Sequence, residues 1–316
     1  MKSTLKVSVC ISTWSRKSKL SKIIQRLEQQ SFPRDLYEIV LIDSNSPDGT
    51  DRMVAGMNNV YGNIVYVKDT VNILAAKRNE GLAHSSGEII IFIDDDVFPT
   101  HRFIEAHYKA NQSSENTFFC GQIRFPVRLC RSSNYFRFRD EQHLKKRNEG
   151  KDLPYNRIVV MNLSGPRALF EQVGEFDERF IGYGGEDQEF GYRLCKKGYK
   201  LRYAGDALAF HLDDTEDIVS YGEKLYKAGL YGNRVLRRVC PNAQILSGWR
   251  TLIVRGILSR PRVSHVLELY LRKTDGNHWL YSYLLFKAYL YSCSYRGKCD
   301  QKRYRELTPE DVSGGW

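Results

Sequence analysis

The sequence predicts an α/β protein in which a mostly parallel β-sheet is flanked by helices and followed by a helical extension. Strand-like and helix-like segments alternate over the first 110 residues, and such repeated units form a parallel sheet whose crossover helices cover both faces. Acidic residues follow two of the strand-like segments, at the sheet edge where ligands bind in this class of protein. After residue 217 the pattern becomes largely helical and stays basic.

The spacing of apolar residues gives the elements in order. It predicts strands at 7–11, 37–42, 63–67 and 88–93, and helices at 18–30, 75–85 and 100–110. Residues 124–156 are polar, aromatic and charged without clear periodicity, so we expect a long surface excursion that serves as a binding loop or lid. Order resumes at 158–161, and 199–204 alternates as a strand.

The composition of the 316 residues argues against several classes of protein. A hydrophobic content of 42% and a charged content of 27% are those of a globular chain. No apolar run reaches the roughly 18 residues of a membrane span, and the first residues lack the apolar stretch of a signal peptide. Seven cysteines form no CxxC pair and no disulfide framework. We therefore expect a reduced, cytoplasmic protein, with a peripheral position on the inner face of the membrane as an alternative.

Positive charge is concentrated in the last hundred residues. Residues 217–316 hold 17 Lys and Arg against 8 Asp and Glu, whereas residues 1–216 hold 31 against 29. This contrast marks 217–316 as a separate basic, aromatic-rich helical unit with an anionic neighbour. Aromatic residues mixed with Lys and Arg, as at 248–262 and 279–293, suit a helix lying in a membrane interface. An ordinary helical subdomain and a contact within a homo-oligomer are the alternatives.

Three adjacent carboxylates, Asp94, Asp95 and Asp96, follow five apolar residues at the end of the strongest predicted strand. Because adjacent carboxylates repel one another, a divalent cation is a common compensation, and Mg²⁺ and Mn²⁺ bind a few carboxylates together with substrate phosphate oxygens. His211, downstream, is a further candidate ligand, since imidazole tolerates Mn²⁺. A solvated acidic turn and a structural histidine explain the same residues without a metal.

A glycine-rich segment at 182–185 leads into a predicted helix that begins near Glu186 and Asp187 and ends at Gly198. The helix dipole favours ionised carboxylates at this end, so an acidic N-cap is the simplest explanation. However, a cap does not need three glycines, and glycine lets the backbone approach a ligand closely. A carboxylate held there is a candidate general base.

These features, in this order, resemble the inverting glycosyltransferases of family 2, which have the nucleotide-sugar-binding fold called GT-A. The Gly-Gly-Glu-Asp segment is similar to that of galactosyltransferase and chondroitin-polymerase-type members. Further similar segments are 7–16, Ala76-Lys77-Arg78-Asn79-Glu80-Gly81, and 162–180. The resemblance covers roughly residues 6–214. It departs from the family at Trp14-Ser15 and at Ser44, which bear on the base pocket and hence on the identity of the nucleotide.

The resemblance implies a catalytic domain at 1–216, with a nucleotide-sugar-binding half at 1–110 and an acceptor-binding half at 111–216. It also implies a role for each matching residue. Asp187 would be the catalytic base, Gly185 and Glu186 would lie beside the acceptor, and Asp96 and His211 would hold Mn²⁺ or Mg²⁺. The residues implied to bind the nucleotide are Thr13, Asp43, Arg78, Asp94 and Asp95.

The expected activity is therefore metal-dependent transfer of a sugar, with inversion, from a nucleotide-diphosphate donor to a hydroxyl acceptor. We expect a UDP-sugar donor and, as acceptor, a glycan of a surface polysaccharide or glycolipid. A nucleotidyltransferase or a non-catalytic nucleotide-sugar binder on the same architecture is one alternative. A nucleic-acid-binding protein is another, because basic and aromatic residues together can follow a phosphate backbone, although no nucleic-acid-binding motif supports it.

Overall fold

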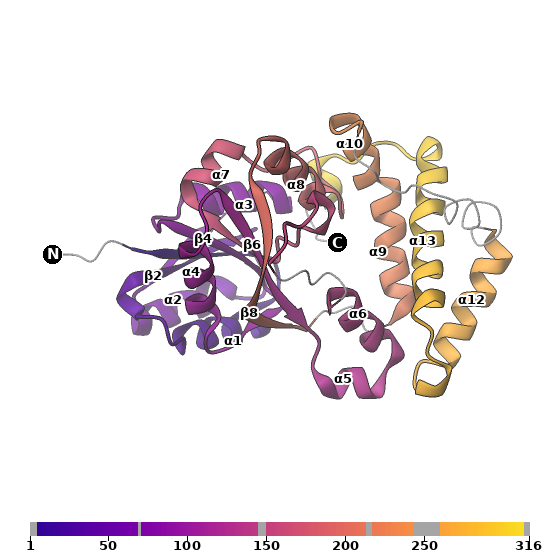
Figure 1. The fold of residues 1–316 in the computed structure, drawn as a ribbon, viewed down its shortest axis with the longest axis horizontal. Helices are drawn as coiled ribbons and strands as arrows, with labels where there is room; N and C mark the ends of the chain where they lie inside the picture. The colour runs from indigo at the N-terminus through magenta and orange to yellow at the C-terminus, as the bar shows by residue number, and fades with distance from the viewer. Residues whose placement is uncertain (1–4, 69–70, 145–149, 213–216, 243–259, 313–316) are drawn as a thin grey trace.

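The computed structural model describes residues 5–68, 71–144, 150–212, 217–242 and 260–312. Figure 1 shows a sheet flanked by helices, with the long helices of the C-terminal part side by side beyond one end of the sheet. The strands are β1 (Val7–Thr13), β2 (Tyr37–Asp43), β3 (Ile64–Lys68), β4 (Ile89–Asp94), β5 (Val97–Pro99), β6 (Thr117–Arg124), β7 (Asn162–Pro166) and β8 (Lys200–His211).

The eight strands form one mixed sheet in the order β3-β2-β1-β4-β7-β6-β8-β5. The first four of this order pair in parallel, which confirms the parallel sheet expected from the alternating pattern. β7 is antiparallel to both β4 and β6, whereas β6 and β8 are parallel. β5 completes the sheet as an antiparallel edge strand next to β8.

Helices cover both faces of this sheet, and others pack beyond one end of it. They are α1 (Lys17–Glu28), α2 (Thr50–Tyr61), α3 (Leu74–Ala83), α4 (Phe103–Gln112), α5 (Val127–Ser132), α6 (Asn134–Leu144), α7 (Arg167–Val173), α8 (Glu186–Lys196), α9 (Ile218–Leu230), α10 (Gly232–Val239), α12 (Pro261–Lys273) and α13 (Tyr283–Asp300). Successive residues of a strand point to opposite faces. Accordingly, Val9 packs in the cluster under α1, α2 and α4, whereas Cys10 packs in the cluster under α3, α7 and α8.

The predicted strands and helices of the first 110 residues are confirmed, with ends that shift by a few residues. Helix α2 was not predicted, because few apolar residues mark its face and only Thr50 and Val54 are buried in it. The prediction of a surface excursion without regular structure is wrong for 127–144, which forms α5 and α6. Helix α6 lacks a periodic pattern because its buried residues include polar and charged ones such as Asn134, Arg139 and Asp140.

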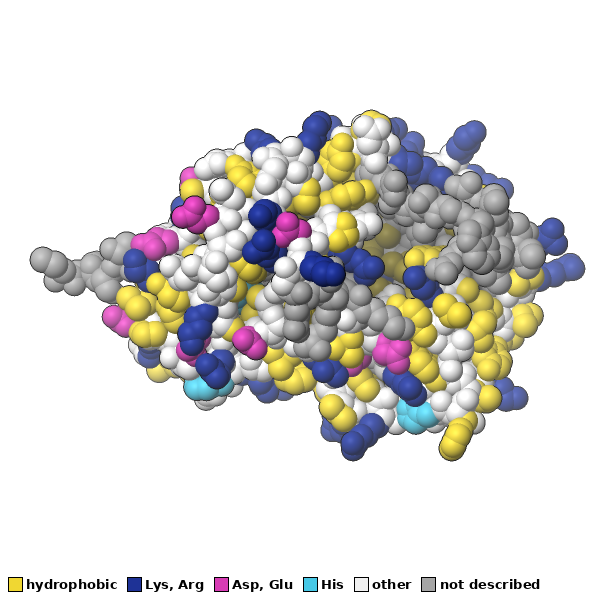
Figure 2. Space-filling model, viewed as in Figure 1, with side chains coloured by type: hydrophobic (Ala, Val, Ile, Leu, Met, Phe, Trp, Pro, Cys, Tyr) yellow, Lys and Arg dark blue, Asp and Glu magenta, His cyan; other side chains and the backbone are white. Residues whose placement is uncertain are grey.

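The C-terminal helices have a hydrophobic cluster of their own. Phe136 and Phe138 of α6 pack there with Ile218 of α9, Leu271 of α12 and Phe286 of α13. The helical character expected after residue 217 is thus confirmed for the described residues, while the domain division at 216 stays a prediction. Among the described helices none is long and apolar enough to cross a membrane. The predicted segment at 248–262 lies outside the described residues, apart from 260–262. On the face shown in Figure 2, basic and hydrophobic side chains lie side by side over the described C-terminal helices.

Candidate active site

The carboxyl ends of three neighbouring parallel strands form the base of the candidate site. Thr13 at the end of β1 pairs with Asp43 at the end of β2, and Ser12 pairs with Asp94 at the end of β4. Almost all other residues of these strands are buried, so the chain leaves the core where each strand ends. The predicted residues Thr13, Asp43 and Asp94 therefore share one edge of the sheet.

The guanidinium of Arg16, a residue that the sequence analysis did not single out, pairs with Asp95 and Asp96. Nη1 of Arg16 donates hydrogen bonds to Asp95 Oδ1 at 2.7 Å and to Asp96 Oδ2 at 2.8 Å. Thr13 Oγ1 donates to the other oxygen of Asp95, also at 2.7 Å. Burial raises the pKa of Asp95, and the positive charge of Arg16 opposes that increase. A basic residue just beyond the strand that carries Thr13 was the available sequence signal.

His211 lies next to Asp96 because β8 brings it there. The antiparallel β5–β8 pairing places His211 opposite Val97, and the N–H of Leu212 donates to the carbonyl oxygen of Asp96 at 2.8 Å. His211 Nε2 is 3.4 Å from Asp96 Oδ1, and both residues are buried. His211 Nδ1 is also buried and has no hydrogen-bond partner among the described residues.

This pair can contribute two ligands to a divalent cation. A carboxylate oxygen and an imidazole nitrogen at this separation suit Mn²⁺, and Mg²⁺ or Mn²⁺ commonly completes its shell with substrate phosphate oxygens and water. In the described part of the chain no cluster of three or more His, Cys, Asp or Glu is placed to hold a metal ion. The two candidate ligands, Asp96 and His211, therefore fit a cation that is bound together with a substrate.

The backbone of the turn before α8 requires glycine at two positions. Gly184 and Gly185 have φ angles of 86° and 105°, in the left-handed region that favours glycine. A Cβ on Gly185 would lie 2.7 Å from the ring of Phe180, so this position also lacks space for a side chain. The turn ends at Gly185 as the N-cap, which places Glu186 and Asp187 in the first turn of α8, as predicted.

Arg78 joins the helix start to the strand end. Its side chain comes from α3 and is only 3% exposed. Nη1 donates to Asp187 Oδ1 at 2.8 Å and lies 3.6 Å from Glu186 Oε1, while Nη2 lies 3.8 Å from Asp94 Oδ1. One buried guanidinium thus faces three carboxylates from two different elements. Asp187 Oδ2 is fixed as well, because it accepts a hydrogen bond from the N–H of Val160 at 3.1 Å.

Three carboxylates around one cation leave an excess of negative charge. Burial raises the pKa of Asp94 to about 7, and burial followed by the charge of Asp187 raises the pKa of Glu186 to about 7. In both cases Arg78 opposes the increase. Glu186 Oε2 is buried without a hydrogen-bond partner among the described residues. The arrangement can therefore hold and release protons near neutral pH.

Asp43 is the predicted residue whose surroundings are most fully occupied. It is completely buried, and its Oδ1 accepts hydrogen bonds from both the N–H and the hydroxyl of Ser46. Tyr66 donates its hydroxyl proton to Asp43 Oδ2 at 2.6 Å. In this conformation Asp43 organises the neighbouring turn, and both of its carboxylate oxygens accept hydrogen bonds from Ser46 and Tyr66.

The structure thus brings the other predicted residues into two connected groups. Thr13, Asp95, Asp96 and His211 are linked through Arg16, and Asp94, Glu186 and Asp187 are linked through Arg78. The groups adjoin because Asp94 and Asp95 are consecutive. Gly185 stands at the start of α8 beside the second group.

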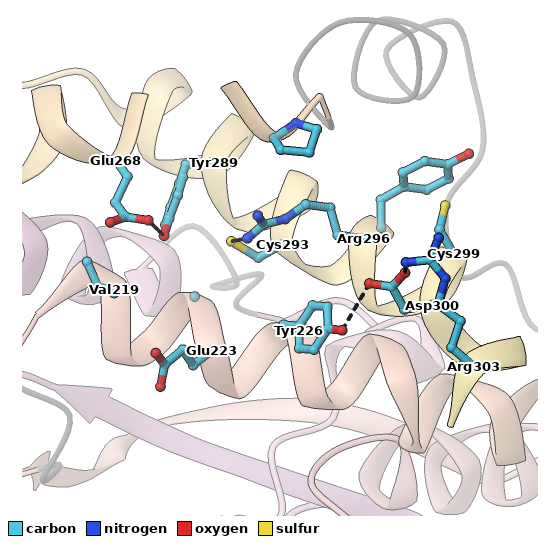
Figure 3. Close-up of a pocket in the computed structure, with 13 residues that line it drawn as sticks. Val219, Glu223, Tyr226, Glu268, Tyr289, Cys293, Arg296, Cys299, Asp300 and Arg303 are labelled. Carbon is cyan, nitrogen blue, oxygen red and sulfur yellow. Dashed lines mark hydrogen bonds and ion pairs between the residues drawn. The ribbon is translucent and has the colours of Figure 1, made fainter. Parts of the chain in front are cut away.

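A cavity of about 610 Å³ lies elsewhere, between α9, α12 and α13. Figure 3 shows that two tyrosines on its wall each donate a hydrogen bond to a carboxylate, Tyr226 to Asp300 and Tyr289 to Glu268, both at 3.0 Å. None of the predicted site residues lines this cavity.

Comparisons with known proteins identify similar chains. The family model described as "Glycosyl transferase family 2" matches residues 8–171, and that described as "N-terminal domain of galactosyltransferase" matches residues 142–213. Glycosyltransferase AglE of Haloferax volcanii is 26% identical over 218 residues, which cover 67% of this chain and 68% of AglE. Chondroitin synthase of Escherichia coli is 24% identical over 237 residues, which cover 65% of this chain but only 34% of that protein.

A solved structure shares the fold. Mannosyltransferase PcManGT from Pyrobaculum calidifontis, in complex with GDP-Man and Mn²⁺, superposes with a TM-score of 0.63 at 14% identity, covering 94% of this chain and 87% of that one. The family resemblance and the GT-A fold expected from the sequence are confirmed by these matches.

Proposed function

Because this chain belongs to glycosyl transferase family 2, we propose that it transfers a sugar from a nucleoside-diphosphate donor to a hydroxyl group of a glycan. The reaction uses a divalent cation and inverts the configuration at the anomeric carbon. That the chain is a glycosyltransferase follows from the family model and from the relatives it matches. The metal, the donor, the acceptor and the role of each residue belong to the proposal.

The observation that carries the proposal is the position of Arg78. Its guanidinium lies between the strand-end carboxylate of Asp94 and the helix-start carboxylates of Glu186 and Asp187. Sugar transfer needs a group that binds a diphosphate and a group that activates an acceptor hydroxyl, held a short distance apart. Arg78 supports this requirement because it ties Asp94, at the strand end that continues into Asp95 and Asp96, to Glu186 and Asp187 at the start of α8.

The donor side is assigned to the strand ends within the nucleotide-sugar-binding half, residues 1–110. Thr13, Asp43, Asp94 and Asp95 would contact the nucleoside, and Arg78 would contact the base or a phosphate. Asp96 and His211 would hold Mn²⁺ or Mg²⁺, which as a Lewis acid stabilises the diphosphate leaving group. We propose a UDP-sugar; the GDP-Man complex of PcManGT makes GDP the competing nucleotide.

The acceptor side is assigned to the start of α8, in the half formed by residues 111–216. Asp187 takes the proton from the acceptor hydroxyl as that oxygen attacks the anomeric carbon from the face opposite the diphosphate, which gives inversion. Gly185 and Glu186 lie beside the acceptor. Because burial raises the pKa of Glu186 to about 7, Glu186 is the second candidate for the base.

The acceptor we propose is a glycan of a surface polysaccharide or glycolipid. The name of chondroitin synthase supports a polysaccharide product, but this chain matches only 34% of that protein. A non-catalytic nucleotide-sugar binder has no need of a base at Asp187. Turnover by the wild-type chain therefore separates the two possibilities, and in an enzyme Asp187→Asn should lower that turnover at least a hundredfold while nucleotide affinity stays intact.

Calorimetric titration tests the donor site. The chain is titrated with UDP, GDP and their common sugar conjugates, each with Mn²⁺ and with EDTA. We expect metal-dependent binding of one nucleotide, and loss of that binding in Asp96→Ala. Asp177→Asn is the matched control, because the Asp177 carboxylate pairs with the exposed Arg179 and not with Arg16 or Arg78. The absence of binding to every nucleotide under both conditions would refute the proposal.

A further inference from the structure

Five exposed apolar side chains lie on α12, on the turn that follows it and at the start of α13. Val266 and Leu269 lie one turn apart on α12, Trp279 and Leu280 lie in the 3-10 turn His278–Leu280, and Leu284 lies in the first turn of α13. Trp279 is 97% exposed and Leu284 is 73% exposed. We call these five side chains the apolar ridge. A cluster of this kind marks an interaction surface rather than scattered surface residues.

The exposure of the ridge is built into the fold. The Asn134 side-chain amide donates to the carbonyl oxygens of Thr274 and Asn277 at 2.8 and 2.9 Å. His278 lies against Asn134 and the carbonyl oxygen of Arg131 through its two ring nitrogens. These contacts fix the turn that carries Trp279 onto the α5–α6 corner. The turn therefore presents the indole to solvent in an ordered position, which reduces the entropy lost on binding.

The exposed charges described on α5 and between residues 260 and 287 have one sign. Exposed cations on and next to α12 are Arg260, Arg262, Arg272 and Lys273, and α5 adds Arg128 and Arg131. The acids described between 260 and 287 are both partly buried and engaged. Glu268 accepts a hydrogen bond from Tyr289 at 3.0 Å, and Asp275 accepts one from the N–H of Tyr135 at 2.8 Å. Within that range no described acidic residue is exposed.

We propose that this end of the helical extension docks on a membrane surface that contains anionic lipids. An exposed Trp with neighbouring Leu side chains suits the boundary between headgroups and acyl chains, where Trp is enriched. The surrounding Arg and Lys side chains suit lipid phosphates, to which each cation near the surface adds attraction. Because no described acid between residues 260 and 287 is exposed, this segment adds no exposed carboxylate that an anionic surface would repel.

Docking at this end has a consequence for the active site. The ring of Phe125, which precedes α5, lies 5.2 Å from the ring of His211. The α5–α6 corner thus connects the docked turn to the candidate metal ligands. A docked enzyme would keep its site at the membrane, where a lipid-linked glycan is available as acceptor. This consequence rests on the proposed function, whereas membrane docking does not.

Vesicle flotation of the full chain tests the docking. The probes are vesicles of phosphatidylcholine alone and of phosphatidylcholine with phosphatidylglycerol, at low and high salt. We expect binding to the anionic vesicles, weakened by salt. The triple variant Trp279→Ser/Leu280→Ser/Leu284→Ser should bind at least tenfold more weakly, and Arg272→Gln/Lys273→Gln should lose roughly fivefold per charge. Val60→Ser is the matched control, because Val60 is 74% exposed on α2.

Thermal unfolding, the nucleotide titration and light scattering, which reports the oligomeric state, complete the test. Thermal unfolding of each variant should match the wild type, because the three apolar side chains are exposed. Nucleotide affinity should also be unchanged, so failure of docking and failure of the proposed function are distinguishable. The docking proposal is overturned if the wild-type chain does not float with anionic vesicles at low salt, or if the triple variant floats equally well. A dimer that the triple substitution dissociates, without lipid binding, would assign the ridge to a second copy instead.

Discussion

Replacing Asp187 by Asn is the most informative single substitution. The change keeps the shape of the side chain but removes its charge and its capacity to accept a proton. In the structure the two carboxylate oxygens accept from two donors, Arg78 Nη1 and the N–H of Val160. An amide has only one oxygen, so it can satisfy one of these donors. The free energy of unfolding should fall by about 1–3 kcal/mol for the donor left unpaired.

The effect on catalysis should be larger than the effect on stability. Loss of a general base costs about 10²–10⁴ in rate, or about 3–5 kcal/mol of activation free energy. The assay is the rate of nucleoside-diphosphate release from the donor, measured beside nucleotide affinity by calorimetry. Because the Asp187 charge helps to raise the pKa of Glu186, carboxyl carbon NMR should show that pKa falling below about 7 in the variant.

Two results would refute this reasoning. Turnover of Asp187→Asn within threefold of the wild type would show that Asp187 is not the base. Loss of turnover in Glu186→Gln but not in Asp187→Asn would assign the role to Glu186. Asp177→Asn should leave turnover unchanged, since its carboxylate pairs with the exposed Arg179. A drop in that variant as well would indicate a general loss of structure.

Two further predictions concern the fold around the site. Gly185→Ala should reduce both thermal stability and turnover, because its Cβ would meet the Phe180 ring at 2.7 Å. In the control Gly198→Ala the new Cβ has no atom within 4 Å, so the free energy of unfolding should fall by only about 1 kcal/mol, for the left-handed backbone. Equal losses in the two variants would argue against a crowded turn at Gly185. Burial lowers the pKa of His107 to about 4, so an unfolded chain takes up its proton first as pH falls from 6.5. Urea unfolding should therefore show a free energy that is lower at pH 5 than at pH 7 by roughly 2 kcal/mol from this group, and His107→Gln should remove that part of the slope.

The edge of the sheet could be predicted because its signals are local. Five apolar residues before Asp94 define a buried strand whose end must reach the ligand-binding edge, and glycines before Glu186 define a turn into a helix. Both predictions depend only on neighbouring residues. The structure therefore places Asp94, Glu186 and Asp187 where the sequence led us to expect them.

Contacts between distant elements could not be predicted in the same way. Arg16 holds Asp95 and Asp96 across 79 and 80 positions of sequence, and no local pattern distinguishes it from a solvated arginine. The helices at 127–144 were missed for a related reason: α6 buries polar side chains such as Asp140, which pairs with Arg124 on β6. Tertiary partners stabilise these residues, and hydrophobic periodicity does not report such partners.

Proton NMR of donor hydrolysis distinguishes inversion from retention and shows whether the reaction needs a metal. The chain is incubated with Mn²⁺ and with the α-linked nucleotide sugar that calorimetry identifies, and the sugar released to water is followed before its anomers interconvert. For a metal-dependent, inverting enzyme we expect the β anomer to appear first, EDTA to stop the reaction, and Asp187→Asn to slow it by at least a hundredfold. First release of the α anomer, or hydrolysis that proceeds equally well in EDTA, would contradict a metal-dependent, inverting glycosyltransferase.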